Sequence, residues 1–393
     1  MKAVVCQNAE LSVQDLPDPI PEKGNLLLKV LRCGICGSDL HVRHHCNHMG
    51  KLLQRTQYMN FPNADEPMVF GHEFCGEILD HGPKTPKTHK VGTRVCAVPI
   101  IRRGNEIDMI GLSRLSHGAY AERMLVQESL VMPIPNGLSD DMAALTEPMA
   151  VGLHAVNRSD IGKRDVAIVI GCGPVGLAVI CMLKAKGVKT VVASDYSPGR
   201  RALALKCGAD VVIDPAKESP YEAAGRKQAY VKTMPDLLEL AISTKEKLNM
   251  LPVPWWHTWR LAETLGLDPK RPVIFECVGV PGLLKNIMDG APLYSRVIVV
   301  GVCMELDKIE PAMGNNKEID LRFVVGYTPL EFHDTLLMIS EGKVPCEAMI
   351  TGKVGLAGVD KAFAALGNPE EHAKILIDPS SNLDAPKKAT ASL

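Results

Sequence analysis

The first part of the chain is a series of short apolar runs separated by glycine and proline. Branched and apolar residues dominate each run, and the runs lie at 2–6, 26–31, 74–79, 94–98 and 124–126. Short runs bounded by turn-forming residues are typical of β-strands. The pattern therefore predicts a compact β-rich domain over residues 1–149.

From about residue 150 the pattern changes to apolar runs that alternate with stretches of helical period. The predicted strands lie at 166–170, 190–194, 211–213, 273–277 and 297–300. This alternation favours a parallel sheet with helices on both faces, so we expect a doubly wound α/β domain over residues 150–325. Beyond it we expect helices at 331–340 and 359–366, a strand at 374–377, and a polar tail without regular structure at 380–393.

A glycine-rich turn follows the first of these strands. Gly171, Gly173 and Gly176 have the spacing GxGxxG, with Pro174 and Val175 between them. The first glycine permits a tight turn, the second lets the backbone approach a pyrophosphate, and the third lets the next helix pack on the strand. That helix offers unpaired N–H groups and a partial positive charge to phosphates. The motif predicts a dinucleotide site.

An acid at the end of the next predicted strand bears on which dinucleotide binds. Asp195 follows the run 190–194, as in dinucleotide-binding folds. Its carboxylate would accept hydrogen bonds from the adenosine ribose hydroxyls and repel a 2′-phosphate, which favours NAD. Arg200 and Arg201 follow closely and would suit a phosphate, so the choice between NAD and NADP stays open.

One stretch interrupts the alternation, because the region 215–270 is far longer than the single helix needed there. It holds all three tryptophans, Trp255, Trp256 and Trp259, with His257 among them. We interpret it as an inserted helical hairpin packed by its own aromatic side chains. Two alternatives stay open: a contact between subunits, or a lid beside the cofactor.

Composition separates this chain from nucleic-acid and membrane proteins. Its 393 residues carry a net charge of −1, with 46% hydrophobic and 23% charged residues. That balance attracts neither nucleic acid nor an anionic membrane, and no apolar run reaches the ~18 residues of a membrane span. We find no export signal at the N-terminus, so we expect the twelve cysteines to be reduced thiols in the cytoplasm.

Three separated segments carry side chains that bind metal ions. Cys36, His72 and Glu147 stand in the strings GICGSDLH, GHE and TEP. A catalytic zinc takes three ligands from cysteine, histidine and carboxylate and keeps a fourth position open. These residues could supply that set beside a dinucleotide, where zinc would act as a Lewis acid on an alcohol.

Together these motifs resemble the zinc-dependent medium-chain alcohol dehydrogenase family. GICGSDLH, GHE, TEP and GCGPVG occur in the family's order, and ECVG follows at 276–279. The resemblance implies a GroES-like catalytic domain at 1–149, a Rossmann domain at 150–325, and a segment 326–393 that returns to the catalytic domain. It also implies that the cofactor contacts Cys277, Val278, Gly301 and Val302.

The resemblance implies roles for the residues around the metal. Cys36 and His72 resemble zinc ligands, and Asp39 resembles the acid that orients His72. Glu147 matches the polyol and butanediol branch of the family. In that branch the glutamate after the histidine, Glu73 here, can coordinate instead. We therefore keep Glu147 and Glu73 as competing ligands and count Glu73 among the catalytic residues too.

Ser38 and His41 resemble a relay that carries the hydroxyl proton to solvent, for which the near-neutral pKa of histidine is suited. The implied reaction is hydride transfer between a secondary alcohol, diol or polyol and NAD, giving the ketone. The alternatives are a primary-alcohol or aldehyde dehydrogenase of the same family, a zinc-free quinone reductase, and a binding protein without catalysis. We expect a homo-oligomer, either a dimer or a tetramer.

Two features depart from the family pattern. Many relatives hold a second, structural zinc on four cysteines, but the segment 100–117 contains none and Cys96 stands alone before it. Thiolates cannot build that site here, so we expect one zinc per chain. The long segment between Cys36 and His72 resembles butanediol-dehydrogenase-like members. We interpret its histidines as part of a solvated loop at the substrate entrance rather than a second metal site: His44, His45 and His48.

Overall fold

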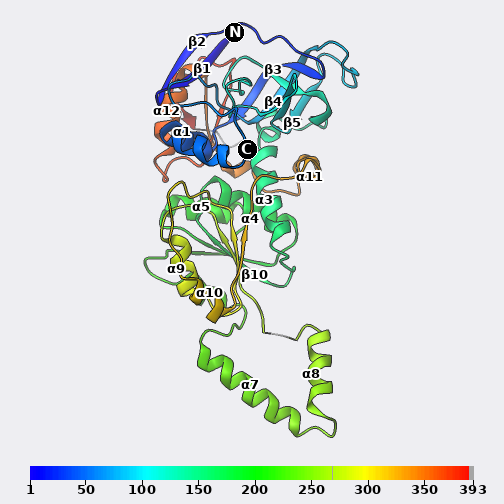
Figure 1. The fold of residues 1–393 in the computed structure, drawn as a ribbon, viewed down its shortest axis with the longest axis vertical. Helices are drawn as coiled ribbons and strands as arrows, with labels where there is room; N and C mark the ends of the chain where they lie inside the picture. Colours follow the sequence, from blue (N-terminus) through cyan, green and yellow to red (C-terminus); the bar gives the residue numbers. More distant parts are fainter. Residues whose placement is uncertain (268, 389–393) are drawn as a thin grey trace.

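The computed structural model describes residues 1–267 and 269–388 as two stacked lobes with a helical arm at the far end (Figure 1). The N-terminal strands and the C-terminal segment share the upper lobe, and the central part of the chain forms the middle lobe. Within these residues, none of the helices combines the length and the apolar character that crossing a bilayer requires.

The upper lobe is built on an extended, largely antiparallel sheet. Its strand order is β18-β16-β17-β3-β4-β5-β9, with β8 paired to β3. Two small antiparallel pairs, β1 with β2 and β6 with β7, complete the lobe. The strands from the first part of the chain are β1 (Lys2–Gln7), β2 (Glu10–Asp15), β3 (Asn25–Gly34), β4 (Glu73–His81), β5 (Arg94–Ala97), β6 (Ile100–Arg103), β7 (Glu106–Met109), β8 (Arg123–Gln127) and β9 (Val131–Pro133).

The end of the chain joins this lobe, and the predicted strand at 374–377 is part of its sheet. β17 (Lys374–Ile377) pairs with β3 and with β16 (Ile350–Val354). Phe363 on α12 (Val359–Leu366) lies 6.3 Å from Phe70 between ring centroids, so the last helix belongs to the same core. The tail is more ordered than predicted, because β18 (Lys387–Lys388) pairs with β16. Residues 389–393 lie outside the described part.

The histidine-rich segment is a helix, and the loop interpretation was wrong. α1 (Gly37–Arg55) buries Val42, Cys46 and Gly50, which recur at four-residue intervals. The histidines between them hid this weak apolar period. His44 and His48 lie on the exposed side of α1, so their solvation, though not their conformation, follows the prediction.

The middle lobe is a doubly wound parallel sheet, which confirms the predicted fold class. Its order is β12-β11-β10-β13-β14-β15, and every neighbouring pair is parallel. The edge strand β15 was not predicted, because Asp320–Phe323 is only half-buried. The strands are β10 (Val166–Ile170), β11 (Thr190–Ser194), β12 (Val211–Ile213), β13 (Val273–Glu276), β14 (Arg296–Val299) and β15 (Asp320–Phe323).

Helices cover both faces of this sheet and join it to the upper lobe. α4 is apolar on most of its surface and is almost wholly buried. Glu331 on α11 accepts a hydrogen bond of 2.9 Å from Asn157 on α3, which ties the return segment to the lobe junction. The helices are α2 (Asp140–Ala143), α3 (Thr146–Arg158), α4 (Pro174–Ala185), α5 (Pro198–Lys206), α6 (Pro220–Gly225), α9 (Leu283–Gly290), α10 (Pro311–Lys317) and α11 (Pro329–Ser340), with short 3-10 turns at Glu128–Leu130, Glu347–Met349 and Leu356–Gly358.

The insertion is a helical hairpin that projects from the middle lobe (Figure 1). It consists of α7 (Met234–Asn249) and α8 (Trp255–Thr264). Trp255 packs edge-to-face on Trp256 and Trp259, each with ring centroids 6.1 Å away. The expected aromatic packing is therefore present. The lid alternative was wrong, because the hairpin lies at the end of the middle lobe that is remote from the upper lobe.

Candidate active site and metal centre

A cavity of about 1120 Å³ separates the two lobes. Both lobes contribute predicted site residues to its wall. Gly176 lies behind the wall, because a Cβ there would stand 1.8 Å from the carbonyl oxygen of Gly171. The upper lobe contributes Cys36, Ser38, His41, His72, Glu73 and Glu147, and the middle lobe contributes Gly171, Gly173, Pro174, Val175, Asp195, Arg200, Cys277, Val278, Gly301 and Val302.

Three predicted metal-binding side chains converge in this cavity. One ligand atom from each of Cys36, His72 and Glu73 lies within 4.8 Å of the other two. The start of α1 positions the cysteine, since its backbone N–H donates to the Asp39 carboxylate at 3.0 Å. A thiol, an imidazole and a carboxylate are donors that zinc prefers. The donor set therefore fits this metal.

His72 is held from behind by a buried acid. Its Nδ1 lies 3.5 Å from Asp39, and the Tyr120 hydroxyl donates to the same carboxylate at 2.7 Å. On the other side of the ring, Nε2 lies 3.4 Å from the Ser38 hydroxyl. Burial lowers the pKa of His72, but the negative charges of Asp39 and Cys36 outweigh it and raise the pKa well above its usual value. Asp39 thus orients the ring and favours positive charge at it.

Glu73 has a cationic partner that sequence analysis missed. The Nζ of Lys374 lies 2.7 Å from both carboxylate oxygens and donates to the carbonyl of Ile35 at 3.0 Å. Both side chains are about 1% exposed, so the pair is fully desolvated. The sequence did contain an indication, because Lys374 interrupts the apolar run 373–377 and lysine is rarely buried unless it is paired.

Glu147 faces the same cavity from the start of α3, but it lies outside the group of three. Burial and the charge of Glu73 raise its pKa, and His72 only partly offsets them. The neutral Tyr327 hydroxyl donates a hydrogen bond to it, and the charge of Lys374 lowers the pKa of Glu147 only weakly. Glu147 therefore receives less compensation from Lys374 than Glu73, whose carboxylate that lysine contacts directly.

The opposite wall has the geometry of a phosphate cradle. Gly171 has φ +91°, in the left-handed region that favours glycine. A Cβ at Gly173 would meet only Arg200, at 4.0 Å, so the space in front of the turn is open. α4 begins directly after this turn and directs its free N–H groups at that space.

Asp195 and Arg200 both line this wall. One oxygen of Asp195 accepts the N–H of Cys172 and the other accepts the N–H of Ser197, both at 2.8 Å. The carboxylate is thus fixed between the glycine-rich turn and the next loop. The Nε of Arg200 is buried and has no hydrogen-bond partner among the described residues. Because buried donors are normally hydrogen-bonded, this guanidinium is suited to bind an oxygen atom of a ligand.

A GroES-like lobe with a thiol–imidazole–carboxylate group, facing a Rossmann lobe across one cavity, defines a zinc-binding dehydrogenase. Residues 22–136 match the family model "Alcohol dehydrogenase GroES-like domain", and residues 174–252 match "Zinc-binding dehydrogenase". The chain belongs to the zinc-dependent medium-chain alcohol dehydrogenase family. It is an oxidoreductase of the CH–OH group that uses zinc and a nicotinamide dinucleotide.

Relatives and solved structures agree along almost the whole chain. The sorbitol dehydrogenase of Bacillus subtilis is 31% identical over 397 residues, which cover 97% of this chain and 98% of the relative. The (R,R)-butanediol dehydrogenase of the same organism is 29% identical over 393 residues, which cover 97% of this chain and 100% of the relative. The crystal structure of 2R,3R-butanediol dehydrogenase from Bacillus subtilis superposes with a TM-score of 0.71 at 28% identity, covering 96% of this chain and 99% of that one.

The buried pair generates a stability prediction. Lys374→Met leaves Glu73 buried without a partner, and breaking a buried ion pair on one side costs roughly 3–5 kcal/mol. We expect a fall in Tm of several degrees, measured by thermal unfolding with a chelator present to remove bound metal. The double variant Lys374→Met/Glu73→Gln should recover most of the loss.

The matched control is Lys353→Met, which removes a half-exposed lysine paired with Asp141. Such pairs contribute about 0–1 kcal/mol, so its Tm should change little. Equal Tm values for Lys374→Met and the control would show that Glu73 does not depend on Lys374.

Proposed function

We propose that this enzyme interconverts a secondary alcohol or diol and its ketone with NAD, at a single catalytic zinc. The observation that carries the proposal is the convergence of Cys36, His72 and two glutamates on the cavity that the glycine-rich turn faces. Zinc there would supply Lewis acidity that eases removal of the hydroxyl proton. The nicotinamide would accept the hydride.

The residues of α1 suit the transfer of that proton. Ser38 lines the cavity next to His72, and His41 follows one helical turn later on the same face. Burial, and then the charge of His45, lower the pKa of His41. The lowered pKa favours the neutral ring, which can accept a proton from the hydroxyl of Ser38, directly or through the cofactor ribose.

We propose Glu147 rather than Glu73 as the third metal ligand. Glu73 is nearer to Cys36 and His72, but Lys374 already neutralises it. Glu147 is buried beside a neutral hydroxyl, so its ionised form gains most from a divalent cation. Lys374 would then act by holding Glu73 away from coordination.

Metal analysis tests this assignment. Cys36→Ala should lose zinc and turnover, whereas Cys46→Ala, in the same helix but turned into the core, should keep both. Glu147→Gln should weaken zinc binding more than about 100-fold, since loss of an outer partner alone costs about 10- to 100-fold. Glu73→Gln should keep the ion and lower Tm.

Zinc content by atomic emission, measured on each purified variant after dialysis, gives the readout. Full turnover in Cys36→Ala without bound metal would refute the proposed function. Loss of zinc in Glu73→Gln with retention in Glu147→Gln would transfer the ligand role to Glu73.

We propose NAD rather than NADP as the cofactor. The fixed carboxylate of Asp195 is placed to receive the ribose hydroxyls and would repel a 2′-phosphate. Arg200 would then bind a ribose oxygen or the pyrophosphate.

We also propose one zinc per chain. The segment 100–117 offers no thiolate, and the thiol of Cys96 donates a hydrogen bond to the carbonyl of Ala143.

Asp195→Ala tests the cofactor preference. Loss of hydrogen bonds to a charged group, about 1.5–3 kcal/mol, should raise the KM for NAD by roughly 10-fold or more and leave the KM for NADP unchanged or lower. Asp214→Ala, one strand further along, serves as the control. Initial rates with both cofactors measure the ratio, and an unchanged ratio would remove Asp195 from this role.

We propose that the enzyme is a cytoplasmic homo-oligomer in which the hairpin α7–α8 contacts a second copy. All twelve cysteines are free, which suits a reducing compartment.

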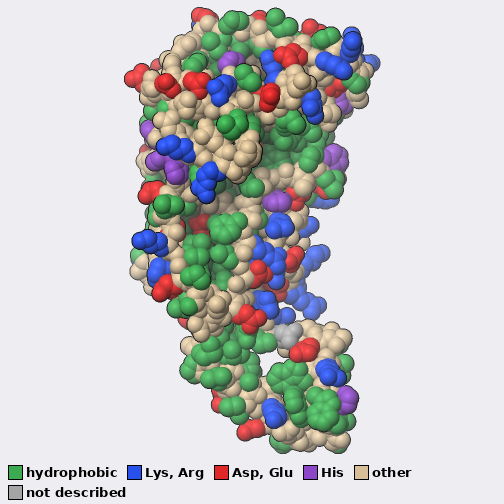
Figure 2. Space-filling view, viewed as in Figure 1, with side chains coloured by type: hydrophobic (Ala, Val, Ile, Leu, Met, Phe, Trp, Pro, Cys, Tyr) green, Lys and Arg blue, Asp and Glu red, His purple; other side chains and the backbone are tan. Residues whose placement is uncertain are grey.

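The hairpin has no buried residue in either helix. Helices of this length are only marginally stable in isolation, so a partner surface would stabilise them. Apolar side chains cover much of it (Figure 2).

The charges of α7 favour a copy of itself as partner. Three apolar residues of α7 form an exposed stripe, with 40%, 58% and 57% of their surface exposed: Met234, Leu238 and Ile242. Acidic residues flank the first half of this helix and lysines flank the second half, with Glu246 between them. In an antiparallel pair about a two-fold axis, acidic residues of each copy would face lysines of the other. The residues concerned are Asp236, Glu239, Lys245 and Lys247.

Leu238→Glu/Ile242→Glu tests this contact. We expect the assembly to dissociate to a smaller species by light scattering, because the stripe would become charged. The kcat should stay within about twofold, since neither helix lines the cavity. The control is Val91→Glu, which introduces the same charge at an apolar residue of the upper lobe that is 59% exposed. An unchanged mass for the double variant would exclude the hairpin from the interface.

A further inference from the structure

The first turn of α5 follows directly after Asp195, the residue proposed to bind the adenosine ribose. Ser197 precedes this helix, and its hydroxyl accepts the N–H of Arg200 at 3.0 Å. The N–H of Gly199 also belongs to the first turn, where backbone donors have no partner within the helix. Free N–H groups beside an arginine form a favourable environment for an anion. A 2′-phosphate on the ribose would therefore be attracted to the start of α5.

A carboxylate from the upper lobe already occupies this position. Glu370 lies in the turn between α12 and β17, and its Oε2 accepts the N–H of Gly199 at 2.9 Å. A Cβ at Gly199 would stand 2.9 Å from this oxygen and 2.9 Å from the backbone oxygen of Glu370. The absence of a side chain at residue 199 is thus what lets the two lobes touch here. The contact leaves a phosphate no access to this N–H.

The same turn is connected to the carboxylate of Asp195. The hydroxyl of Ser197 donates to the carbonyl of Pro369 at 3.4 Å, and the N–H of Ser197 donates to Asp195 at 2.8 Å. Pro369 lines the cavity between the lobes together with Asp195 and Arg200. Glu370 therefore lies beside the part of the cavity where the adenosine ribose is expected.

The charge of Glu370 is retained in this contact. Hydrogen bonding to Ser197 and to Gly199 lowers the pKa of its carboxyl group. The charges of Arg201 and Arg200 lower this pKa further. The carboxylate is therefore ionised at neutral pH. Because it is exposed to solvent, its field is partly screened, and it acts mainly on groups in the first turn of α5.

The two arginines differ in how much of their hydrogen bonding is used within the protein. Arg201 donates to the backbone carbonyls of Asp195 and Tyr196 at 2.7 and 2.8 Å. Arg200 lines the cavity, and its buried Nε has no hydrogen-bond partner among the described residues. Arg200 is thus the arginine that a 2′-phosphate would reach, and Glu370 supplies a negative charge that competes for it.

We propose that Glu370 is a specificity-determining residue that excludes NADP, because its carboxylate occupies the anion site that a 2′-phosphate would need at the start of α5. The proposal rests on the proposed function and adds to Asp195 a second determinant, which the upper lobe supplies. A phosphate with a charge of about −2 would have to displace this carboxylate or lie beside it, and both are unfavourable. NAD has a hydroxyl at the same position and meets no such repulsion.

Binding of the two reduced cofactors to the full-length enzyme tests this role without relying on turnover. Glu370→Gln keeps the size of the side chain and removes its charge. We expect the Kd for NADPH to fall about 5-fold, a modest effect because the charge is exposed, while the Kd for NADH stays within about twofold. Glu370→Ala, which also vacates the position, should lower the Kd for NADPH about 10-fold. Titration of the cofactor fluorescence gives both constants.

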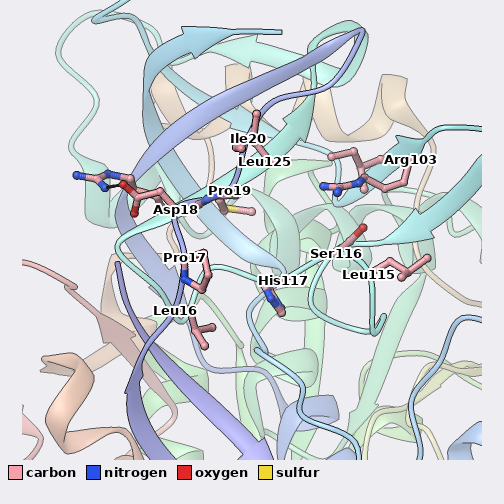
Figure 3. Close-up of a pocket in the computed structure, with 13 residues that line it drawn as sticks. Leu16, Pro17, Asp18, Pro19, Ile20, Arg103, Leu115, Ser116, His117 and Leu125 are labelled. Carbon is pink, nitrogen blue, oxygen red and sulfur yellow. Dashed lines mark hydrogen bonds and ion pairs between the residues drawn. The ribbon is translucent and has the colours of Figure 1, made fainter.

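Two matched variants control for a general loss of negative charge. Glu371→Gln removes the same charge from the next residue, which is exposed. Asp18→Asn removes an exposed carboxylate that Arg123 pairs, at a separate cavity of about 260 Å³ in the upper lobe (Figure 3). Neither variant should change the ratio of the two Kd values by more than about twofold. The effect of Glu370→Gln should persist in the background of Asp195→Ala, because each carboxylate repels the phosphate directly.

Equal weakening of NADH and NADPH binding in Glu370→Gln would overturn the proposal, because Glu370 would then act only as a cap for α5. An equal effect of Glu371→Gln, or loss of the effect in the Asp195→Ala background, would overturn it too. A wild-type enzyme whose preference for NADH is unchanged by Glu370→Gln would refute this inference alone. A wild-type enzyme that binds NADPH as tightly as NADH would refute the proposed cofactor preference as well. Failure of the zinc-loaded enzyme to oxidise any alcohol would refute the proposed function and leave the binding test valid.

Discussion

The active site is governed by the need to neutralise carboxylates buried where the two lobes meet. Glu73 is neutralised by Lys374, and Asp39 is stabilised by Tyr120 and His72. Glu147 has a neutral hydroxyl and only partial compensation from the charges of His72 and Lys374. Burying a carboxylate is costly unless it is paired, so a further cation would stabilise the site. The divalent ion that we propose beside Cys36, His72 and Glu147 would supply that charge.

This constraint also explains why segments so far apart in sequence meet here. Lys374 enters on β17, a strand that pairs with β3 just before Cys36. The C-terminal segment therefore completes the catalytic lobe and also supplies a charge without which Glu73 could not be buried. The hydrogen bond from Nζ of Lys374 to the carbonyl of Ile35 places this lysine next to the start of α1.

Sequence reasoning found the parts that local chemistry determines. The glycine turn and the alternation of the parallel sheet follow from residue type and spacing, and so does the choice of Cys36 and His72, whose side chains the structure brings together. It missed Lys374, because which lysine neutralises a glutamate three hundred positions away depends on strand pairing. It missed the helix α1, because histidines lie between the apolar residues that face the core. It missed β15, since an edge strand needs to bury only part of its side chains.

The choice between Glu147 and Glu73 shows the same limit. Both carboxylates are suitable by residue type, and spacing alone gives no reason to prefer either. Only the three-dimensional placement of Lys374 separates them, because this lysine contacts Glu73 directly and affects Glu147 only weakly. The ligand that we propose therefore follows from the surrounding charges and not from the motif.

The segment 100–117 is held in place by hydrogen bonds around one buried carboxylate. Asp108 accepts hydrogen bonds from Asn60 and Ser116, and the Tyr58 hydroxyl lies 3.5 Å from the same carboxylate. Such a network holds its strands in one arrangement only while every donor is present. Its apolar neighbours Met109 and Leu112 line the cavity between the two lobes. The network around Asp108 therefore fixes one part of the cavity wall, while the pairing of Glu73 with Lys374 fixes charged side chains that face the same cavity.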